Sequence, residues 1–187
     1  MKCLFLGYNK KKTKLIDFLK KKKIKVIDKD TELLKTDLKK FDIIISFGYR
    51  KIISKKIIKN CKRPIINLHM SYLPYNKGAH PNFWSFINNT PKGVSIHEID
   101  EGIDTGKIIF QKKIRFKKFR NLKFDETYNI LFSEIENLFI KNFKKILNRK
   151  YKLKKNLLLK GQTHTLKDLP KNLKNWKTNI SDYLKDY

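Results

Sequence analysis

Apolar runs alternate with amphipathic segments along the chain as far as His69. The run Asp42–Phe47 is continuous, as expected for a parallel strand that is buried on both faces. Thr13 can cap a helix whose apolar residues follow at helical spacing. The predicted strands are Lys2–Leu6, Lys25–Ile27, Asp42–Phe47 and Ile65–His69, and a second helix is predicted at Ser54–Lys59. This alternation favours an α/β fold, a single Rossmann-like domain with a mostly parallel central sheet and flanking helices.

Two more strands and a long helix follow. Gly93–Ile99 and Ile108–Phe116 are expected to pair as strands, and Asn82–Asn88 to form a short helix. Asp125 can cap a helix that reaches about Leu147 and covers the sheet. Its apolar positions are Tyr128, Leu131, Phe132, Ile135, Leu138, Phe139 and Ile146. We therefore expect a main domain over residues 1–150 and a short basic C-terminal extension over 151–187, packed on or near it.

The net charge of +28 changes this picture less than its size suggests. Such a charge can indicate a nucleic acid, an anionic membrane or an acidic substrate. Only five of the 45 basic residues are Arg, while Ile, Asn and Phe are abundant, as an AT-rich genome would encode. Specific phosphate and base readout usually relies on Arg. We interpret the charge as compositional drift and expect no specific nucleic-acid partner, although a basic cleft would attract an anionic substrate.

Cysteine usage and hydropathy bear on location. Cys3 and Cys61 form no C-x-x-C pair, which favours a reducing, cytoplasmic compartment. The apolar run Cys3–Leu6 is too short for a signal peptide, and no stretch approaches the length of a membrane span. We therefore expect no membrane association.

Polar residues gather at the end of one predicted strand. Asn67 and His69 share a face of the strand Ile65–His69, at the carboxyl end, where open α/β sheets bind ligands. A Gly-rich turn after the strand Gly93–Ile99 delivers Asp104. An amide, an imidazole and a carboxylate that converge there suit acyl transfer to an amine. A Ser71–His69–Asp104 hydrolase is disfavoured because no G-x-S-x-G elbow is present.

Metal binding is not expected. The four histidines are His69, His80, His97 and His164, and no His, Cys and Asp residues cluster at the spacing of metal ligands. We interpret His97 as a partly buried neighbour of the site, with a secondary role left open.

Two linked motifs resemble those of the folate-dependent formyltransferases. The first, Asn-x-His-x-Ser-x-Leu-Pro-x-x-x-Gly, runs from Asn67 to Gly78, and the second, Asp-Glu-Gly-x-Asp-Thr-Gly, from Asp100 to Gly106. Both are intact, and the resemblance covers roughly residues 1–150. It implies a catalytic trio of Asn67, His69 and Asp104, with 10-formyltetrahydrofolate as the formyl donor.

The same resemblance places the folate. In the family, the strand end and loop corresponding to Phe47, Gly48, Tyr49 and Arg50 line the pterin pocket, and we expect Asp100 and Gly102 to face them. From the residues alone, an ordinary turn before the helix Ser54–Lys59 is an equal alternative. Asn67 and His69 can hydrogen-bond the oxyanion of the tetrahedral intermediate, and Asp104 can assist the proton transfer. Whether His69 or Asp104 accepts the proton is left open.

The resemblance leaves three acceptor amines. The family's methionyl-tRNA enzymes carry a separate C-terminal barrel, for which too few residues follow the long helix. The phosphoribosylglycinamide enzymes carry a Gly-Ser-rich phosphate loop, where this chain has Gly7-Tyr-Asn-Lys-Lys-Lys-Thr. The segment Tyr75–Trp84 is most similar to sugar-nucleotide N-formyltransferases of surface glycan synthesis. An amino-sugar nucleotide such as a dTDP-4-amino-4,6-dideoxy hexose is therefore the favoured acceptor.

The loop that follows His69 must border this acceptor. Its candidate substrate contacts are Lys77, Gly78, His80 and Trp84. Lys77 is its one cation and could meet a diphosphate, or it could be one more solvated lysine; Trp84 could equally be core. A homodimer is left open. A basic nucleic-acid-binding domain with this fold is the remaining alternative, and the intact trio argues against it.

Overall fold

The computed structural model spans residues 1–187 and describes all of them except 34–37, 118–120 and 158–162. The described residues form a six-stranded sheet in the order β2-β1-β3-β4-β6-β7. Its strands are β1 (Lys2–Gly7), β2 (Lys25–Lys29), β3 (Ile43–Phe47), β4 (Ile65–His69), β6 (Gly93–Glu98) and β7 (Ile108–Lys113). The first four are parallel, whereas β6 and β7 join antiparallel beside β4. The predicted α/β fold with a mostly parallel sheet is confirmed.

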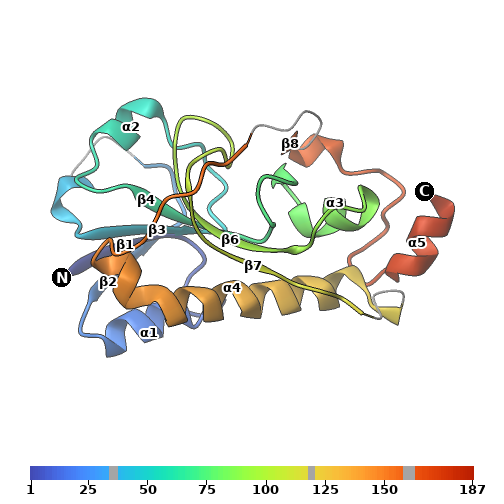
Figure 1. Cartoon of the computed structure of the whole chain (residues 1–187), viewed down its shortest axis with the longest axis horizontal. Coiled ribbons are helices and arrows are strands. Elements are labelled where there is room, and N and C mark those ends of the chain that lie inside the picture. Colours follow the sequence, from blue (N-terminus) through green and yellow to red (C-terminus); the bar gives the residue numbers. More distant parts are fainter. Residues whose placement is uncertain (34–37, 118–120, 158–162) are drawn as a thin grey trace.

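Helices flank the sheet on both sides. The described helices are α1 (Leu15–Lys21), α2 (Lys55–Lys59), α3 (Pro81–Ile87), α4 (Phe124–Leu147) and α5 (Ile180–Asp186), with 3-10 turns at Leu38–Lys40 and Leu166–Asp168. Helices α1 and α4 run along one face and α2 lies on the other (Figure 1). Two short strands, β5 (Lys77–Gly78) and β8 (Thr163–His164), pair with each other away from the main sheet.

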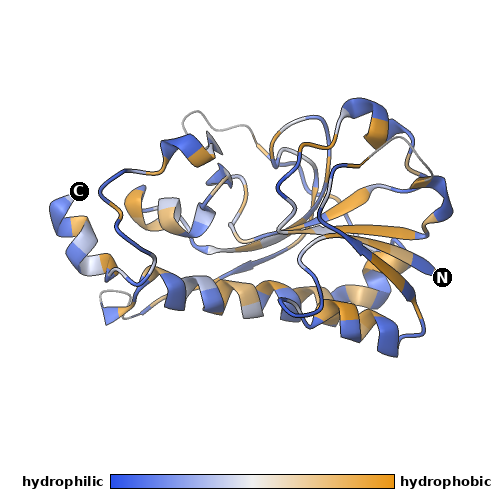
Figure 2. Cartoon of the chain, turned by 180° about the vertical axis from the view of Figure 1, so that it is seen from behind, coloured by the Kyte–Doolittle hydropathy of each residue, from blue (hydrophilic) through white to orange (hydrophobic). Residues whose placement is uncertain are grey.

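The middle strand β3 shows why the sheet forms where the apolar runs predict it. All five of its residues are buried. Ile43, Ile45 and Phe47 pack into the core under α1 and α4, while Ile44 packs into a second core on the α2 side. Successive residues of a strand point to opposite faces, so a strand between two helical layers must be apolar throughout. Figure 2 shows hydrophobic residues concentrated in the central strands of the sheet and hydrophilic residues in the surface loops.

Several element boundaries differ from the sequence prediction, and contacts explain three of the differences. Lys14 takes the N-cap position of α1, while the Thr13 hydroxyl accepts the Leu15 N–H at 3.2 Å and donates to the buried Glu136 of α4 at 2.6 Å, tying the two helices together. Asp125 lies in the first turn of α4, because the N-cap is Lys123, two residues earlier, whose N–H donates to Glu126 at 2.7 Å. Strand β7 ends at Lys113 instead of Phe116, since its partner β6 begins at Gly93.

The described residues after α4 return across the molecule to the end that holds α3. Lys154 and Ile108 exchange backbone hydrogen bonds, and β8 pairs with β5. Helix α5 then packs its Ile180 and Tyr183 against α3. The division into a domain over residues 1–150 and an extension over 151–187 stays a prediction. Within the described part of the chain, no helix combines the length and apolarity needed to cross a bilayer.

Candidate active site

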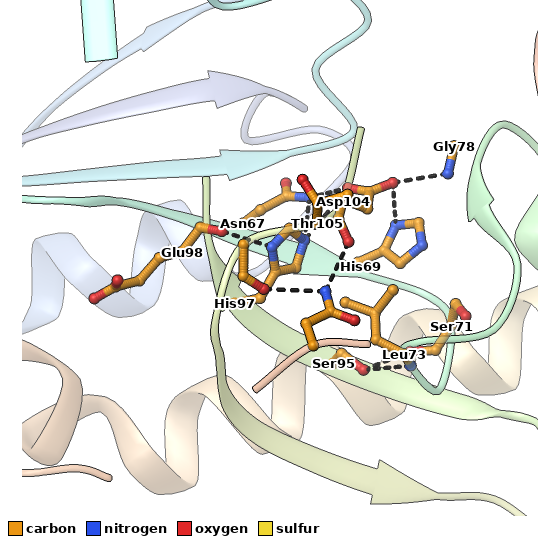
Figure 3. Close-up of polar contacts among 12 residues, drawn as sticks. Asn67, His69, Ser71, Leu73, Gly78, Ser95, His97, Glu98, Asp104 and Thr105 are labelled. Carbon is orange, nitrogen blue, oxygen red and sulfur yellow. Dashed lines mark hydrogen bonds and ion pairs between the residues drawn. The ribbon is translucent and has the colours of Figure 1, made fainter. Parts of the chain in front are cut away.

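Four polar side chains meet at the carboxyl end of β4 (Figure 3). Asn67 and His69 project from β4, and β6 places His97 directly opposite Asn67 in the antiparallel ladder. The turn between β6 and β7 supplies Asp104, whose backbone is left-handed at φ 50°. We call these four residues the Asp104 cluster. The sequence placed three of them together, and the structure does bring those three into contact.

Both carboxylate oxygens of Asp104 are occupied by the protein. Oδ1 accepts a hydrogen bond from Asn67 Nδ2 at 3.1 Å and lies 3.3 Å from His97 Nε2. Oδ2 accepts the Gly78 N–H at 2.8 Å and lies 3.5 Å from His69 Nδ1. The carboxylate thus links β4 to the loop that follows it.

Burial and these partners act against each other on the carboxyl group. Burial alone would raise the pKa of Asp104, but the two imidazoles and the Gly78 N–H hold it well below its usual range. Burial also lowers the pKa of His69, more than the neighbouring carboxylate raises it. Near neutral pH the site therefore holds a charged Asp104 beside a neutral His69.

His97 has a larger part in the cluster than the sequence suggested. It is 1% exposed. Its Nδ1 lies 2.8 Å from the Glu98 carbonyl oxygen and donates there, and its Nε2 lies 3.0 Å from Asn67 Nδ2. The signal for this contact is the pairing register of β4 and β6, which the sequence alone does not reveal.

Lys77, the predicted diphosphate contact, is buried. It is 2% exposed, and its Nζ donates to the carbonyl oxygens of Pro74 at 3.0 Å and Leu157 at 2.9 Å. Burial lowers the pKa of its ammonium group, against the raising effect of Asp104. This geometry does not favour a diphosphate contact, because the ammonium already serves two backbone carbonyls beneath the surface. The chain segment at Leu157, distant in sequence, is what covers it.

The other predicted acceptor contacts divide into two kinds. Trp84 is buried in the core around α3, and its indole stacks on His164 with ring centres 4.1 Å apart. Gly78 and His80 are half-buried, and the His80 ring lies 5.0 Å from that of Trp176. The substrate role of these three residues stays a prediction, and the burial of Trp84 fits the alternative of core packing.

The predicted folate residues surround a turn at the end of β3. The Phe47 ring is buried against Tyr8 and Phe132, whereas Gly48 and Arg50 are exposed. Gly48 has φ 70°, and a Cβ there would collide with the Tyr8 ring, so the position requires glycine. The Tyr49 hydroxyl donates to the Thr31 carbonyl oxygen at 3.0 Å.

The Asp100 turn is the other predicted part of the folate site. Asp100 Oδ1 accepts the Gly102 N–H at 3.1 Å and the Thr105 hydroxyl at 2.5 Å, which braces the turn internally. An ion pair of 2.8 Å joins Glu101 to Lys55 at the start of α2. Folate binding by these residues stays a prediction. Among the described residues, no group of three or more His, Cys, Asp or Glu side chains is placed to hold a metal ion.

Comparison with known proteins gives one consistent family. Residues 6–130 match the formyl transferase family. The chain is 37% identical to a methionyl-tRNA formyltransferase of Prochlorococcus marinus over 154 residues, covering 80% of this chain and 45% of that protein. It is 40% identical to a GDP-perosamine N-formyltransferase of Brucella melitensis over 74 residues, covering 39% and 29%. The chain thus spans less than half the length of these curated relatives.

Solved structures agree over a greater length. The formyltransferase PseJ from Anoxybacillus kamchatkensis, in complex with UDP-4,6-dideoxy-4-formamido-L-AltNAc and tetrahydrofolate, is 40% identical with a TM-score of 0.89. That match covers 98% of this chain and 97% of PseJ. An N-formyltransferase from Helicobacter canadensis, in complex with folinic acid and dTDP-3-aminofucose, is 25% identical with a TM-score of 0.77, over 98% and 78% of the two chains.

Proposed function

The chain belongs to the formyl transferase family, and from this premise we propose that it transfers the formyl group of 10-formyltetrahydrofolate to the amine of a nucleotide-linked amino sugar. The observation that carries the proposal is the Asp104 cluster, in which one buried carboxylate contacts an amide, an imidazole and the acceptor loop. The likeness to PseJ along nearly the whole of both chains supports a sugar acceptor.

The ligand in the PseJ structure favours one nucleotide for the proposed acceptor. PseJ was solved with a UDP-linked 4-formamido-4,6-dideoxy sugar, the type of product that N-formylation of a 4-amino sugar gives. We therefore place a UDP-linked 4-amino-4,6-dideoxy sugar ahead of the dTDP-linked hexose that the sequence suggested. Methionyl-tRNA is the second candidate, because formyltransferases of that name are among the curated relatives.

In the proposed reaction the acceptor amine attacks the formyl carbon carried on N10 of the folate. The new N–C bond places negative charge on the formyl oxygen, and collapse of the intermediate breaks the bond to N10. Asn67 Nδ2 can donate to that oxygen, and one such donor typically contributes about 3 kcal/mol to the rate. Its two protons now serve Asp104 and His97, so the formyl oxygen would replace one of these acceptors.

We assign the proton acceptor to His69. The depressed pKa of Asp104 makes its carboxylate the weaker base, whereas the neutral imidazole can take a proton from the attacking amine. His69 Nδ1 faces Asp104, and its Nε2 lies 3.3 Å from the Asn76 carbonyl oxygen. A neutral ring can donate to only one of these oxygens, but an imidazolium can donate to both. The same proton can then pass to N10 as the tetrahydrofolate leaves.

The proposal also covers the cellular compartment and the oligomeric state of the protein. The free cysteines Cys3 and Cys61 support a cytoplasmic site of action. A homodimer stays a prediction.

A panel assay tests the acceptor. The protein with 10-formyltetrahydrofolate would be offered UDP-, dTDP- and GDP-linked amino sugars, glycinamide ribonucleotide and methionyl-tRNA. We expect saturable formylation of an amino-sugar nucleotide, and none in the Asp104→Asn variant. Turnover confined to methionyl-tRNA or to glycinamide ribonucleotide would remove the sugar assignment.

A further inference from the structure

We propose that Asn156 is a positioning residue that holds the catalytic turn carrying Asp104 from the C-terminal side. It lies beyond residues 6–130, the range that matches the family, and outside both sequence motifs. The proposal rests on the proposed function, because it assigns Asn156 a part in placing the carboxylate of that same site.

The turn between β6 and β7 needs outside support at its base. Asp104 adopts a left-handed backbone conformation that is unfavourable for a residue with a side chain. Gly106 is pressed so closely against the Glu98 carbonyl that a Cβ there would collide with it. Asp100 braces the tip of the turn through Gly102 and Thr105, but these bonds do not reach the carbonyl groups of Asp104 and Gly106.

Asn156 binds both of those carbonyl groups. Its Nδ2 donates to Asp104 O at 2.8 Å and to Gly106 O at 3.0 Å, and the residue is 8% exposed. One side-chain amide therefore holds the backbone on both sides of Thr105, at the base of the turn. This requires two protons on one nitrogen, which Asn supplies and Asp does not.

The segment that carries Asn156 is itself anchored at both ends. Lys154 exchanges two backbone hydrogen bonds with Ile108 at the start of β7, at 2.8 and 2.9 Å. Leu157 accepts the hydrogen bond from the buried Lys77 ammonium. Residues 154–157 thus connect the catalytic turn to the acceptor loop, whose Gly78 N–H donates to the Asp104 carboxylate itself. The buried Lys77 ammonium thereby anchors this segment from the acceptor loop.

Removal of the Asn156 amide should release the backbone of Asp104 and displace its carboxylate from His69. An error of about 1 Å in the position of a catalytic group can cost on the order of 100-fold in rate. For Asn156→Ala we expect kcat to fall at least about tenfold, with KM for folate and for the sugar nucleotide within about threefold of wild type.

The matched control is Asn82→Ala. Asn82 is 5% exposed, and its Nδ2 also donates to two oxygens, Phe124 O at 2.9 Å and Thr127 Oγ1 at 3.1 Å. These bonds join α3 to α4 and do not involve Asp104. Both variants should lower Tm by a similar amount, but only Asn156→Ala should lower kcat. An equal loss of kcat in Asn82→Ala would overturn the positioning role.

A second readout does not depend on turnover. The pKa of His69, measured by NMR titration in the ligand-free protein, is set by burial and by Asp104, His97, Lys77 and the Asn76 carbonyl. Because Asp104 raises this pKa, its displacement in Asn156→Ala should lower the titration midpoint further, whereas Asn82→Ala should leave it in place. An unchanged midpoint in Asn156→Ala overturns the proposal even if wild type formylates none of the amines tested. Should Asn156→Ala fail to fold, Asn156→Ser, which keeps one donor, carries the same comparison.

Discussion

The carboxyl ends of the neighbouring strands β4 and β3 differ in how many of their side chains make contacts within the protein. At β4, each side chain of the Asp104 cluster contacts another member of the cluster. At β3, the turn Phe47–Lys51 buries its first ring, while Gly48, Arg50 and Lys51 are exposed. The difference indicates a division of work: groups proposed to do chemistry are held before any ligand arrives, whereas groups proposed to hold the folate face outward.

Holding the Asp104 cluster in this form has a cost in stability. A buried carboxylate loses its hydration, and a left-handed backbone at a residue other than glycine adds about 1–3 kcal/mol of strain. The Asn67 amide, the Gly78 N–H and two imidazoles offset the first cost through polar contacts with the carboxylate. Asn156 offsets the second through the backbone of the turn.

Removing the charge at the centre of the Asp104 cluster should have the largest effect. Asp104→Asn keeps the shape of the side chain but loses the anion that orients both imidazoles, so we expect kcat to fall at least about 100-fold. Steady-state kinetics with saturating folate would measure it, with Asp182→Asn, at a side chain 70% exposed, as the matched control. Near-normal turnover in Asp104→Asn, or in His69→Ala, would show that the cluster is not the catalytic centre.

The sequence predicted that Asn67, His69 and Asp104 lie together, but it did not predict the contacts of His97 and Asn156 with them. Asn67 and His69 follow from strand periodicity, and Asp104 from a motif close to them in the chain. The contact of His97 with Asn67 depends on strand register, and that of Asn156 with Asp104 on a return of the chain after a 24-residue helix. The burial of Lys77 was missed for the same reason, since a lysine between Pro74 and Gly78 suggests an exposed loop, whereas its ammonium donates to the distant Leu157 carbonyl.

The second prediction tests His97, which the sequence left as a neighbour. His97→Ala leaves the Glu98 carbonyl and one Asn67 proton without their partner, so we expect kcat to fall about tenfold and Tm to drop with it. His164→Phe is the matched control, because it keeps a ring stacked on Trp84 and lies outside the Asp104 cluster. If both variants lose stability but neither loses kcat, His97 is only a packing residue.

The third prediction concerns pH. Burial lowers the pKa of His69 below its ordinary value of 6.5, and the low pKa of Asp104 keeps the carboxylate charged throughout the range. A neutral imidazole is needed as base, so kcat should be level above pH 6.5 and fall only at lower pH, by a few fold over the first unit of its decline. A kcat–pH profile in wild type would measure this. An acid limb centred above pH 6.5 would mean that His69 works in its protonated form.

The smallest effect is expected at the exposed turn, where Arg50→Ala should raise KM for folate about threefold and leave kcat and Tm unchanged. The side chain is exposed, so its loss removes a ligand contact without disturbing the core.

The same variant can also tell which ligand Arg50 contacts, because burial and the charge of Arg50 both lower the pKa of His80, in the acceptor loop. The charge of Arg50, in the proposed folate turn, therefore also acts on the acceptor loop. A rise confined to KM for the sugar nucleotide would assign it to the acceptor, and equal rises in both constants would place it between the two. Lys51→Ala, the neighbouring exposed cation, separates loss of this guanidinium from loss of one positive charge in general.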